Sequence, residues 1–372
     1  MIATVAQFVR LLNDLAPTCL AESWDNVGLQ IGSRKWPVKK IWTALDPLPE
    51  VVAAASENEV DLLVTHHPLF FKSLKQIDCE SPLGRIAETA LTAKLAIFCA
   101  HTNLDSTAGG VNDVLAERMG VKQLRVLGAA ADAGVSKLVI FAPESHARGV
   151  MDALFAEGAG RIGNYSCCSF RCAGTGSFLP GDQAEPVVGE VGSLSEVQES
   201  RIEVLVANDK VDRMASAARK AHPYETMAYD VYPLTAKDRE AGLGRVGTLA
   251  AAMGLDRFSE NLKSTLNLTA VKIAGPADRP VRKVALCSGS GGSLLPQAIA
   301  SGADAYVSGD LGYHTARDAQ QAGIALVDIG HFGSEHLIVD VLAAAIRKAA
   351  EAGGLAAVVE ANNLETDPFH YV

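Results

Sequence analysis

The chain has 372 residues, of which 48% are hydrophobic and 20% are charged, so it has ample material for a globular core and cannot be wholly disordered. This length predicts two or three domains. The 33 Lys and Arg residues against 43 Asp and Glu residues give a net charge of −10, which disfavours binding to the phosphate backbone of nucleic acids.

Two further classes are disfavoured by local pattern. No run of about 18 apolar residues predicts a membrane span, and the N-terminal segment lacks the layout of a signal peptide. The seven cysteines are scattered without a C-x-x-C pair, which favours free thiols in a reducing compartment. We therefore expect a cytoplasmic protein without a membrane anchor.

Residues 1–130 alternate between predicted strands and helices. Apolar runs at 41–45, 61–65 and 95–100 predict buried strands, and the segments between them have helical composition. Strands separated by helices are typical of a parallel sheet. We expect a first α/β half here.

Residues 131–235 have a different pattern. A predicted strand and helix are followed by β-rich stretches around 165–175 and 187–191, a strand at 201–206, a helix and a last strand at 226–232. We interpret this as the β-α-β-β-α-β order of ferredoxin-like α+β domains, inserted between two joints at 128–133 and 235–244.

Residues 236–372 return to α/β alternation, with predicted strands at 283–287, 303–308, 324–329 and 356–360 and a long helix at 333–350. The segments 60–65 and 303–308 also resemble each other, since each places an Asp before an apolar run. The fold class that we predict is α/β, with two similar parallel-sheet halves that form one unit and enclose the inserted domain.

The strongest chemical signal is Thr65-His66-His67-Pro68. Two adjacent histidines follow a predicted strand, and ligands of open α/β sheets bind at the carboxyl ends of the strands. Because adjacent residues that leave a strand diverge, the two imidazoles suit two metal ions better than one. The alternative is a polar turn with one buried and one exposed histidine.

Two weaker signals occupy the same kind of position. His101 and Asp105 follow the strand at 95–100, and His331 and Glu335 follow the strand at 324–329. Positions i and i+4 lie on one face of a helix, which sets an imidazole beside a carboxylate. The alternative for both segments is ordinary helix capping. His101 could be a ligand, an acid/base group or a residue that orients a ligand.

Together these signals predict a metal site. Three histidines and two carboxylates follow strands at the same kind of sheet edge, and this set suits two divalent cations with one carboxylate bridging them. The predicted ligands are His66, His67, Asp105, His331 and Glu335. The glycine-rich turn at 288–292 could cradle a phosphate, but it lacks a Walker ending and better fits a tight turn.

With these motifs in view, the sequence resembles the GTP cyclohydrolase 1 type 2 homologue family, also called the NIF-three-like proteins, over essentially the whole chain. The motifs that carry the resemblance are Glu22-Ser23-Trp24-Asp25-Asn26-Val27-Gly28, Thr65-His66-His67-Pro68, His101-Thr102-Asn103-Leu104-Asp105, Gly242-Leu243-Gly244-Arg245-Val246-Gly247 and Gly330-His331-Phe332-Gly333-Ser334-Glu335. The resemblance implies a dinuclear metal site on the five predicted ligands, with Glu335 bridging and His101 nearby. It also implies a homohexamer and a PII/CutA-like identity for the inserted domain.

The function that we expect is that of a metal-dependent hydrolase that uses two divalent ions, such as zinc, iron or manganese. Its substrate would be a nucleotide or another phosphate-containing small molecule, and His101 would be the nearest acid/base group. The alternative is a non-catalytic metal-binding or regulatory scaffold that oligomerises.

Overall fold

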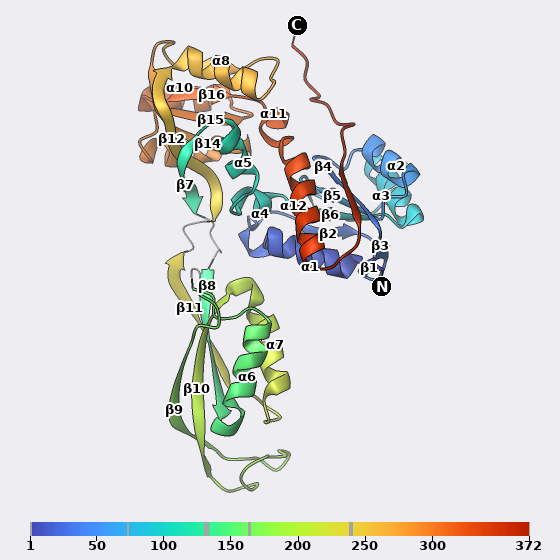
Figure 1. The fold of residues 1–372 in the computed structure, drawn as a ribbon, viewed down its shortest axis with the longest axis vertical. Coiled ribbons are helices and arrows are strands. Elements are labelled where there is room, and N and C mark those ends of the chain that lie inside the picture. Colours follow the sequence, from blue (N-terminus) through green and yellow to red (C-terminus); the bar gives the residue numbers. More distant parts are fainter. Residues whose placement is uncertain (1, 73, 130–133, 163–164, 238–240, 372) are drawn as a thin grey trace. The chain divides into compact units, whose positions relative to one another are not determined.

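The computed structural model describes residues 2–72, 74–129, 134–162, 165–237 and 241–371. The chain divides into two compact units, one formed by Met1–Ala131 with Arg239–Val372 and the other by Asp132–Asp238 (Figure 1). Parts of the two predicted joints, residues 130–133 and 238–240, lie outside the described residues. Within the described residues, no helix is both long enough and apolar enough to cross a membrane.

The first sheet of the larger unit has five strands. Its order is β17 (Val358–Ala361), β4 (Lys40–Ala44), β5 (Leu62–Thr65), β6 (Ala96–Cys99) and β2 (Gly28–Ile31). The pairs β17–β4, β4–β5 and β5–β6 are parallel, whereas β2 is antiparallel to β6. The predicted parallel β-α-β pattern is therefore present, with an antiparallel edge added to it.

Helices cover both faces of this sheet because side chains alternate along each strand. Leu62 and Val64 face a core shared with α1 (Val5–Leu15) and α12 (Ile338–Ala352), whereas Leu63 faces α2 (Pro49–Glu57) and α3 (Pro82–Ala93). All three strand residues are fully buried. The two-sided burial explains why the strands are continuous apolar runs in the sequence.

The second sheet has six strands. Its order is β13 (Lys272–Ala274), β16 (Ala325–Asp328), β15 (Ala305–Gly309), β14 (Pro280–Ser290), β12 (Gly242–Gly254) and β7 (Lys122–Ala129). In this sheet, the pairs β14–β15 and β15–β16 are parallel, and the other described pairs are antiparallel. One face packs against α5 (Val111–Arg118) and α8 (Leu255–Thr265), and the other packs against α9 (Leu295–Ala300) and α10 (Tyr313–Ala322).

Two strands pair across the predicted halves 1–130 and 236–372. Strand β17, expected in the second half, pairs with β4 of the first sheet, and β7 from the first region pairs with β12 of the second sheet. Local hydrophobic pattern predicts a strand but not its partner, so the sequence could not show this exchange. The predicted helix at 333–350 is also two helices, α11 (His331–Glu335) and α12, interrupted at residues 336–337.

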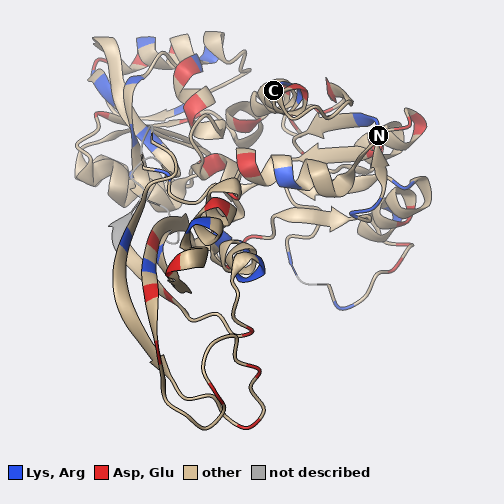
Figure 2. Ribbon diagram, turned by 60° about the horizontal axis from the view of Figure 1, so that its bottom comes forward, with Lys and Arg blue, Asp and Glu red and all other residues tan. Residues whose placement is uncertain are grey.

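The smaller unit contains β8 (Gly134–Pro143), α6 (Glu144–Ala156), β9 (Ser169–Phe178), β10 (Ser195–Ala207), α7 (Val211–Ala221) and β11 (Tyr229–Lys237). Its antiparallel sheet has the order β11-β8-β10-β9, and α6 and α7 share its buried face. This is the expected β-α-β-β-α-β order. The stretch 187–191 is not a strand, because Pro186, Gly189 and Gly192 place it in a loop. Figure 2 shows Asp and Glu on that loop, and Lys and Arg elsewhere in both units.

Candidate metal centre

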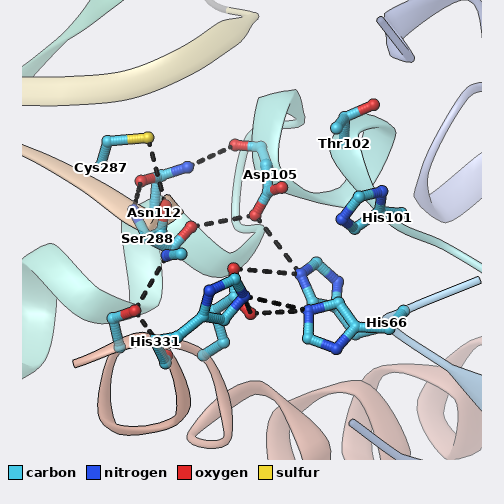
Figure 3. Close-up of polar contacts among 12 residues, drawn as sticks. His66, His101, Thr102, Asp105, Asn112, Cys287, Ser288 and His331 are labelled. Atoms are coloured by element: carbon cyan, nitrogen blue, oxygen red, sulfur yellow. Dashed lines mark hydrogen bonds and ion pairs between the residues drawn. The ribbon is translucent and has the colours of Figure 1, made fainter. Parts of the chain in front are cut away.

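The predicted ligands come together in the larger unit, at the ends of strands from both sheets. His66 and His67 follow β5, and Asp105 lies in α4 (Thr102–Ser106), directly after β6. His331 and Glu335 are the first and last residues of α11, which follows β16. Figure 3 shows side chains from these separate segments converging on one point.

Glu335 lies at the middle of this cluster. Its Oε2 is 2.9 Å from His67 Nε2 and 3.0 Å from His331 Nε2. Its Oε1 is 3.6 Å from His66 Nε2, which is 3.7 Å from Asp105 Oδ1. The ligands therefore form two groups that share one carboxylate, an inner group of His66, Asp105 and Glu335 and an outer group of His67, His331 and Glu335.

Each histidine is held through its Nδ1 atom, so that the other ring nitrogen is left for the centre. The Nδ1 contacts are 2.9 Å from His66 to the Ala100 carbonyl, 2.8 Å from His67 to Asp46, 2.7 Å from His331 to Asp310, and 2.9 Å from His101 to Asp25. A carbonyl or carboxylate oxygen only accepts, so Nδ1 donates and Nε2 keeps its lone pair in the neutral ring. Such partners fix the orientation of metal-binding imidazoles.

The ring nitrogens that face the centre of the cluster are suited to bind cations. His66 Nε2 is buried and has no hydrogen-bond partner, although buried polar atoms are usually paired. The Nε2 atoms of His67 and His331 are 3.3 Å apart, with both Nδ1 atoms already bonded. A divalent ion in each group would satisfy these lone pairs, and imidazole with carboxylate is a donor set accepted by zinc, iron and manganese.

The electrostatics of the cluster also favour positive charge. Burial lowers the pKa of His67, but hydrogen bonds to Asp46 and Glu335 outweigh it and raise the pKa to about 10. The hydrogen bond to Glu335 raises the pKa of His331 to about 9. Burial opposes ionisation of Glu335, yet the adjacent histidines hold its pKa well below the usual range. The carboxylates that hold protons on these rings would stabilise a metal ion in exchange for those protons.

Residues outside the predicted ligand set hold Asp105 in place. Ser288 Oγ donates to Asp105 Oδ1 at 3.0 Å, and Asn112 Nδ2 donates to the Asp105 carbonyl at 3.0 Å. Asn112 Oδ1 in turn accepts the Ser288 N–H at 2.9 Å. Burial raises the pKa of the Asp105 carboxyl, and the Ser288 hydroxyl acts in the opposite direction.

The glycine turn at 288–292 forms one wall of the centre and is not a phosphate cradle. The N–H groups of Ser288, Gly289 and Gly291 already donate to Asn112, Ser334 and Ser308. Gly289 has φ +59°, and a Cβ atom there would lie 2.2 Å from Glu335 Oε1. Glycine at this position therefore leaves space for the Glu335 carboxylate.

Sequence reasoning missed the three aspartates that hold histidines, Asp25, Asp46 and Asp310. Asp46 and Asp310 lie just after β4 and β15, so a position after a strand could have identified them. Asp310 also has φ +54°, which only the structure shows. His101 lies beside the cluster, with ring centroids 5.2 Å from His66 and 5.6 Å from His67.

Two sheets of one α/β unit share a cluster of histidines and carboxylates. This arrangement defines the class of the protein, which is an α/β protein with a candidate metal centre at a sheet edge. The chain belongs to the Duf34/NIF3 (NGG1p interacting factor 3) family, whose model matches residues 3–368, and the family predicted from the motifs is confirmed.

Relatives of similar length support this membership. A Bacillus subtilis protein named GTP cyclohydrolase 1 type 2 homolog is 42% identical over 329 residues, which are 88% of each chain. A Halalkalibacterium halodurans protein of the same name is 36% identical over 371 residues, with 100% of both chains covered. The crystal structure of a Bacillus cereus protein related to NIF3 matches with a TM-score of 0.84 and 38% identity over 100% of both chains.

Proposed function

We propose that this chain binds two divalent cations and acts as a metal-dependent hydrolase on a nucleotide or another phosphate-containing small molecule. The observation that carries the proposal is the position of Glu335, whose two oxygens face separate groups of histidines. A carboxylate shared in this way is typical of a bridge between two ions.

The five proposed ligands are His66, His67, Asp105, His331 and Glu335, with zinc, iron or manganese as the candidate ions. Two such ions, when bound, would lower the pKa of water and neutralise negative charge that develops on a departing oxygen. The rest of the chemistry belongs to the protein. Asp46 and Asp310 orient the imidazoles of His67 and His331 through hydrogen bonds, and Ser288 orients the Asp105 carboxylate in the same way.

His101 is the proposed acid/base group. Its Nδ1 is bonded to Asp25, whose pKa is lowered to about 2, because the hydrogen bond and charge of His101 outweigh the burial that raises it. The other ring nitrogen is left to exchange a proton with the substrate. The alternative role is that of an additional ligand beside His66 and His67.

A cavity of about 590 Å³ reaches the outer group, which supports access for a small molecule. His67 and His331 line it together with Lys272, whose Nζ is 2.6 Å from Asp328. The names of the relatives contain a nucleotide reaction, GTP cyclohydrolase, which supports a nucleotide as the substrate class.

The experiment is a turnover screen of metal-loaded protein against nucleotides and phosphate esters, with the metal content measured for each variant. Glu335→Ala should abolish turnover and lower bound metal. His101→Ala should lose about 10²- to 10⁴-fold in rate and keep both metals, and His314→Ala, an exposed histidine of the same unit, is the control. Loss of metal from His101→Ala would instead make His101 a ligand. If wild type turns over no substrate, the hydrolase proposal fails and a metal-binding scaffold replaces it.

We further propose, from the family resemblance, a PII/CutA-like inserted domain at 131–235 and a cytoplasmic homohexamer that binds neither nucleic acid nor membrane. The strand order β11-β8-β10-β9 supports the first point. Light scattering should give six times the chain mass of 39.0 kDa if the assembly is correct. A smaller mass at micromolar concentration would reject the hexamer.

A further inference from the structure

Two large aromatic side chains lie exposed beside His101. Trp24 is 55% exposed and Phe71 is 56% exposed, although they come from loops that are distant in the sequence. Their ring centroids are 5.6 Å apart at an interplanar angle of 42°. We call Trp24 and Phe71 the aromatic pair. Single exposed aromatic residues are common on protein surfaces, but an exposed pair in mutual contact beside a candidate site offers a contiguous apolar surface to a ligand.

The aromatic pair is continuous with the candidate metal centre. The His101 ring is 6.0 Å from Trp24 and 6.4 Å from Phe71, in edge-to-face arrangements. The same ring lies 5.2 Å from His66. A line of rings therefore leads from solvent to a proposed ligand through the proposed acid/base residue.

Hydrogen bonds hold the two loops in fixed positions. Gln30 bonds to both loops, since its Nε2 donates to the Asn26 carbonyl at 2.8 Å and its Oε1 accepts the Phe70 N–H at 3.1 Å. Asn26 Nδ2 also donates directly to the Phe70 carbonyl at 2.6 Å. On the other side, Asp25 binds both His101 and the Thr102 N–H. Sites held in this way lose little entropy when they bind a ligand.

The space beside the aromatic pair has room for a small molecule and is lined by a basic residue. A cavity of about 400 Å³ is lined by Trp24, Asp25, Phe71 and Lys72 among others. Lys72 is the one basic residue among the described residues that line it, and the Asp25 carboxylate is already bonded to His101 and Thr102. Aromatic side chains bury about 150–250 Å² each. By itself the pair is too small for the roughly 800 Å² per partner of a stable protein interface.

We propose that Trp24 and Phe71 form the binding site for the planar base of a nucleoside phosphate, with Lys72 facing its anionic part. This proposal rests on the proposed function, because it names the part of the substrate that extends away from the metals. Base stacking on aromatic side chains tolerates any base, because every base has a π-face, and it adds to the attraction between a basic residue and the phosphate. His101 then lies between the stacked ring and the metal ligands.

The test measures binding to metal-loaded, full-length protein, with guanosine monophosphate and ribose 5-phosphate as probes. The variants are Trp24→Leu, Phe71→Leu and the conservative Trp24→Phe, and Tyr313→Leu is a matched control on an exposed tyrosine of α10. Both Leu variants should bind guanosine monophosphate roughly 10- to 100-fold more weakly. Trp24→Phe and Tyr313→Leu should bind it as wild type does, and ribose 5-phosphate should bind equally to all.

Three results would overturn the proposal. The first is equal affinity of the Leu variants and wild type for guanosine monophosphate. The second is no preference of wild type for guanosine monophosphate over ribose 5-phosphate. The third is a changed oligomeric mass in the Leu variants, which would make the aromatic pair a contact between copies. Turnover of a phosphate ester that has no ring, without base binding, would reject this site and leave the hydrolase proposal intact. Base binding without turnover of any substrate would support this site and reject the hydrolase proposal.

Discussion

The two sheets share one hydrogen-bonding arrangement. It lies at the start of the middle strand of three parallel strands, which are β4, β5 and β6 in the first sheet and β14, β15 and β16 in the second. Asp61 precedes β5, and its Oδ2 accepts the N–H groups of Lys39 and Lys40 at 2.7 and 2.9 Å. Asp304 precedes β15 and accepts the N–H groups of Arg282 and Lys283 at 2.9 and 2.8 Å. All strand pairs concerned are parallel. The repeat noticed in the sequence is thus a repeat of hydrogen bonding, which supports a duplicated origin.

The opposite ends of the same strands differ. After β5 the chain supplies two imidazoles that are candidate ligands, whereas after β15 it supplies Asp310, which holds His331. The burial differs too, since the side chain of His66 in the inner group is 0% exposed and that of His331 in the outer group is 36% exposed. The comparison teaches that two copies of one scaffold can differ in what they supply, since one is followed by two candidate ligands and the other by a residue that holds a candidate ligand. We infer that the outer group, which is the more exposed one, is the one that meets substrate.

The largest expected effect follows from removing the residue that joins the two groups. Glu335→Gln should lose both metals, with affinity falling by more than the roughly 10- to 100-fold caused by loss of an outer hydrogen-bond partner. Metal analysis after dialysis measures this, with Glu351→Gln, an exposed glutamate of α12, as the control. Retention of one equivalent of metal would show that the two groups are independent.

The next effect compares one aspartate from each repeat. Asp46→Asn and Asp310→Asn each disturb one histidine of the outer group, so each should weaken one metal by about 10- to 100-fold and leave the inner metal bound. Competition with a chelator gives the affinities, and Asp318→Asn on the exposed face of α10 is the control. Unequal losses from the two variants would indicate that the repeats support the outer position differently.

A smaller effect is expected where the two repeats are alike. Asp61→Ala and Asp304→Ala each remove two hydrogen bonds to a charged acceptor, so each should lower the free energy of unfolding by about 1.5–3 kcal/mol. Chemical denaturation of the metal-loaded protein measures the change, with Asp278→Ala in an exposed turn as the control. A large loss at one site and none at the other would contradict the structural equivalence.

The smallest effect concerns pH. In metal-free protein the raised pKa values, about 10 for His67 and about 9 for His331, mean that the folded state binds protons more tightly than the unfolded state. The resulting stability is complete below the unfolded pKa of about 6.5 and is lost as pH rises through 9 to 10. The melting temperature of metal-free protein should therefore fall by a few degrees between pH 7 and 10. His67→Gln should reduce that fall, and an unchanged slope in this variant would reject the assignment.

The sequence indicated which side chains would cluster because chemistry-bearing residues follow apolar strands, and parallel strands end at one edge of a sheet. It could not indicate which sheet each strand joins. Strand β17 follows α12, whose apolar face packs beside α1 on the first sheet, and that choice depends on contacts between residues hundreds of positions apart. The supporting roles of Asp46 and Asp310 were missed although both residues follow strands, because the sequence does not show that their side chains face His67 and His331. The Val-Val stretch at 187–188 has strand propensity, but the neighbouring prolines and glycines override it.

The shared carboxylate also has a consequence for biosynthesis. Glu335 follows His67 by 268 residues. At about 5–20 residues per second, the ribosome makes the second residue on the order of ten to fifty seconds after the first. During that interval the nascent chain presents the paired histidines without the carboxylate that completes either group. For the two ions proposed above, tight capture would therefore wait until nearly the whole chain has emerged, and metal loading would be a late step that follows synthesis.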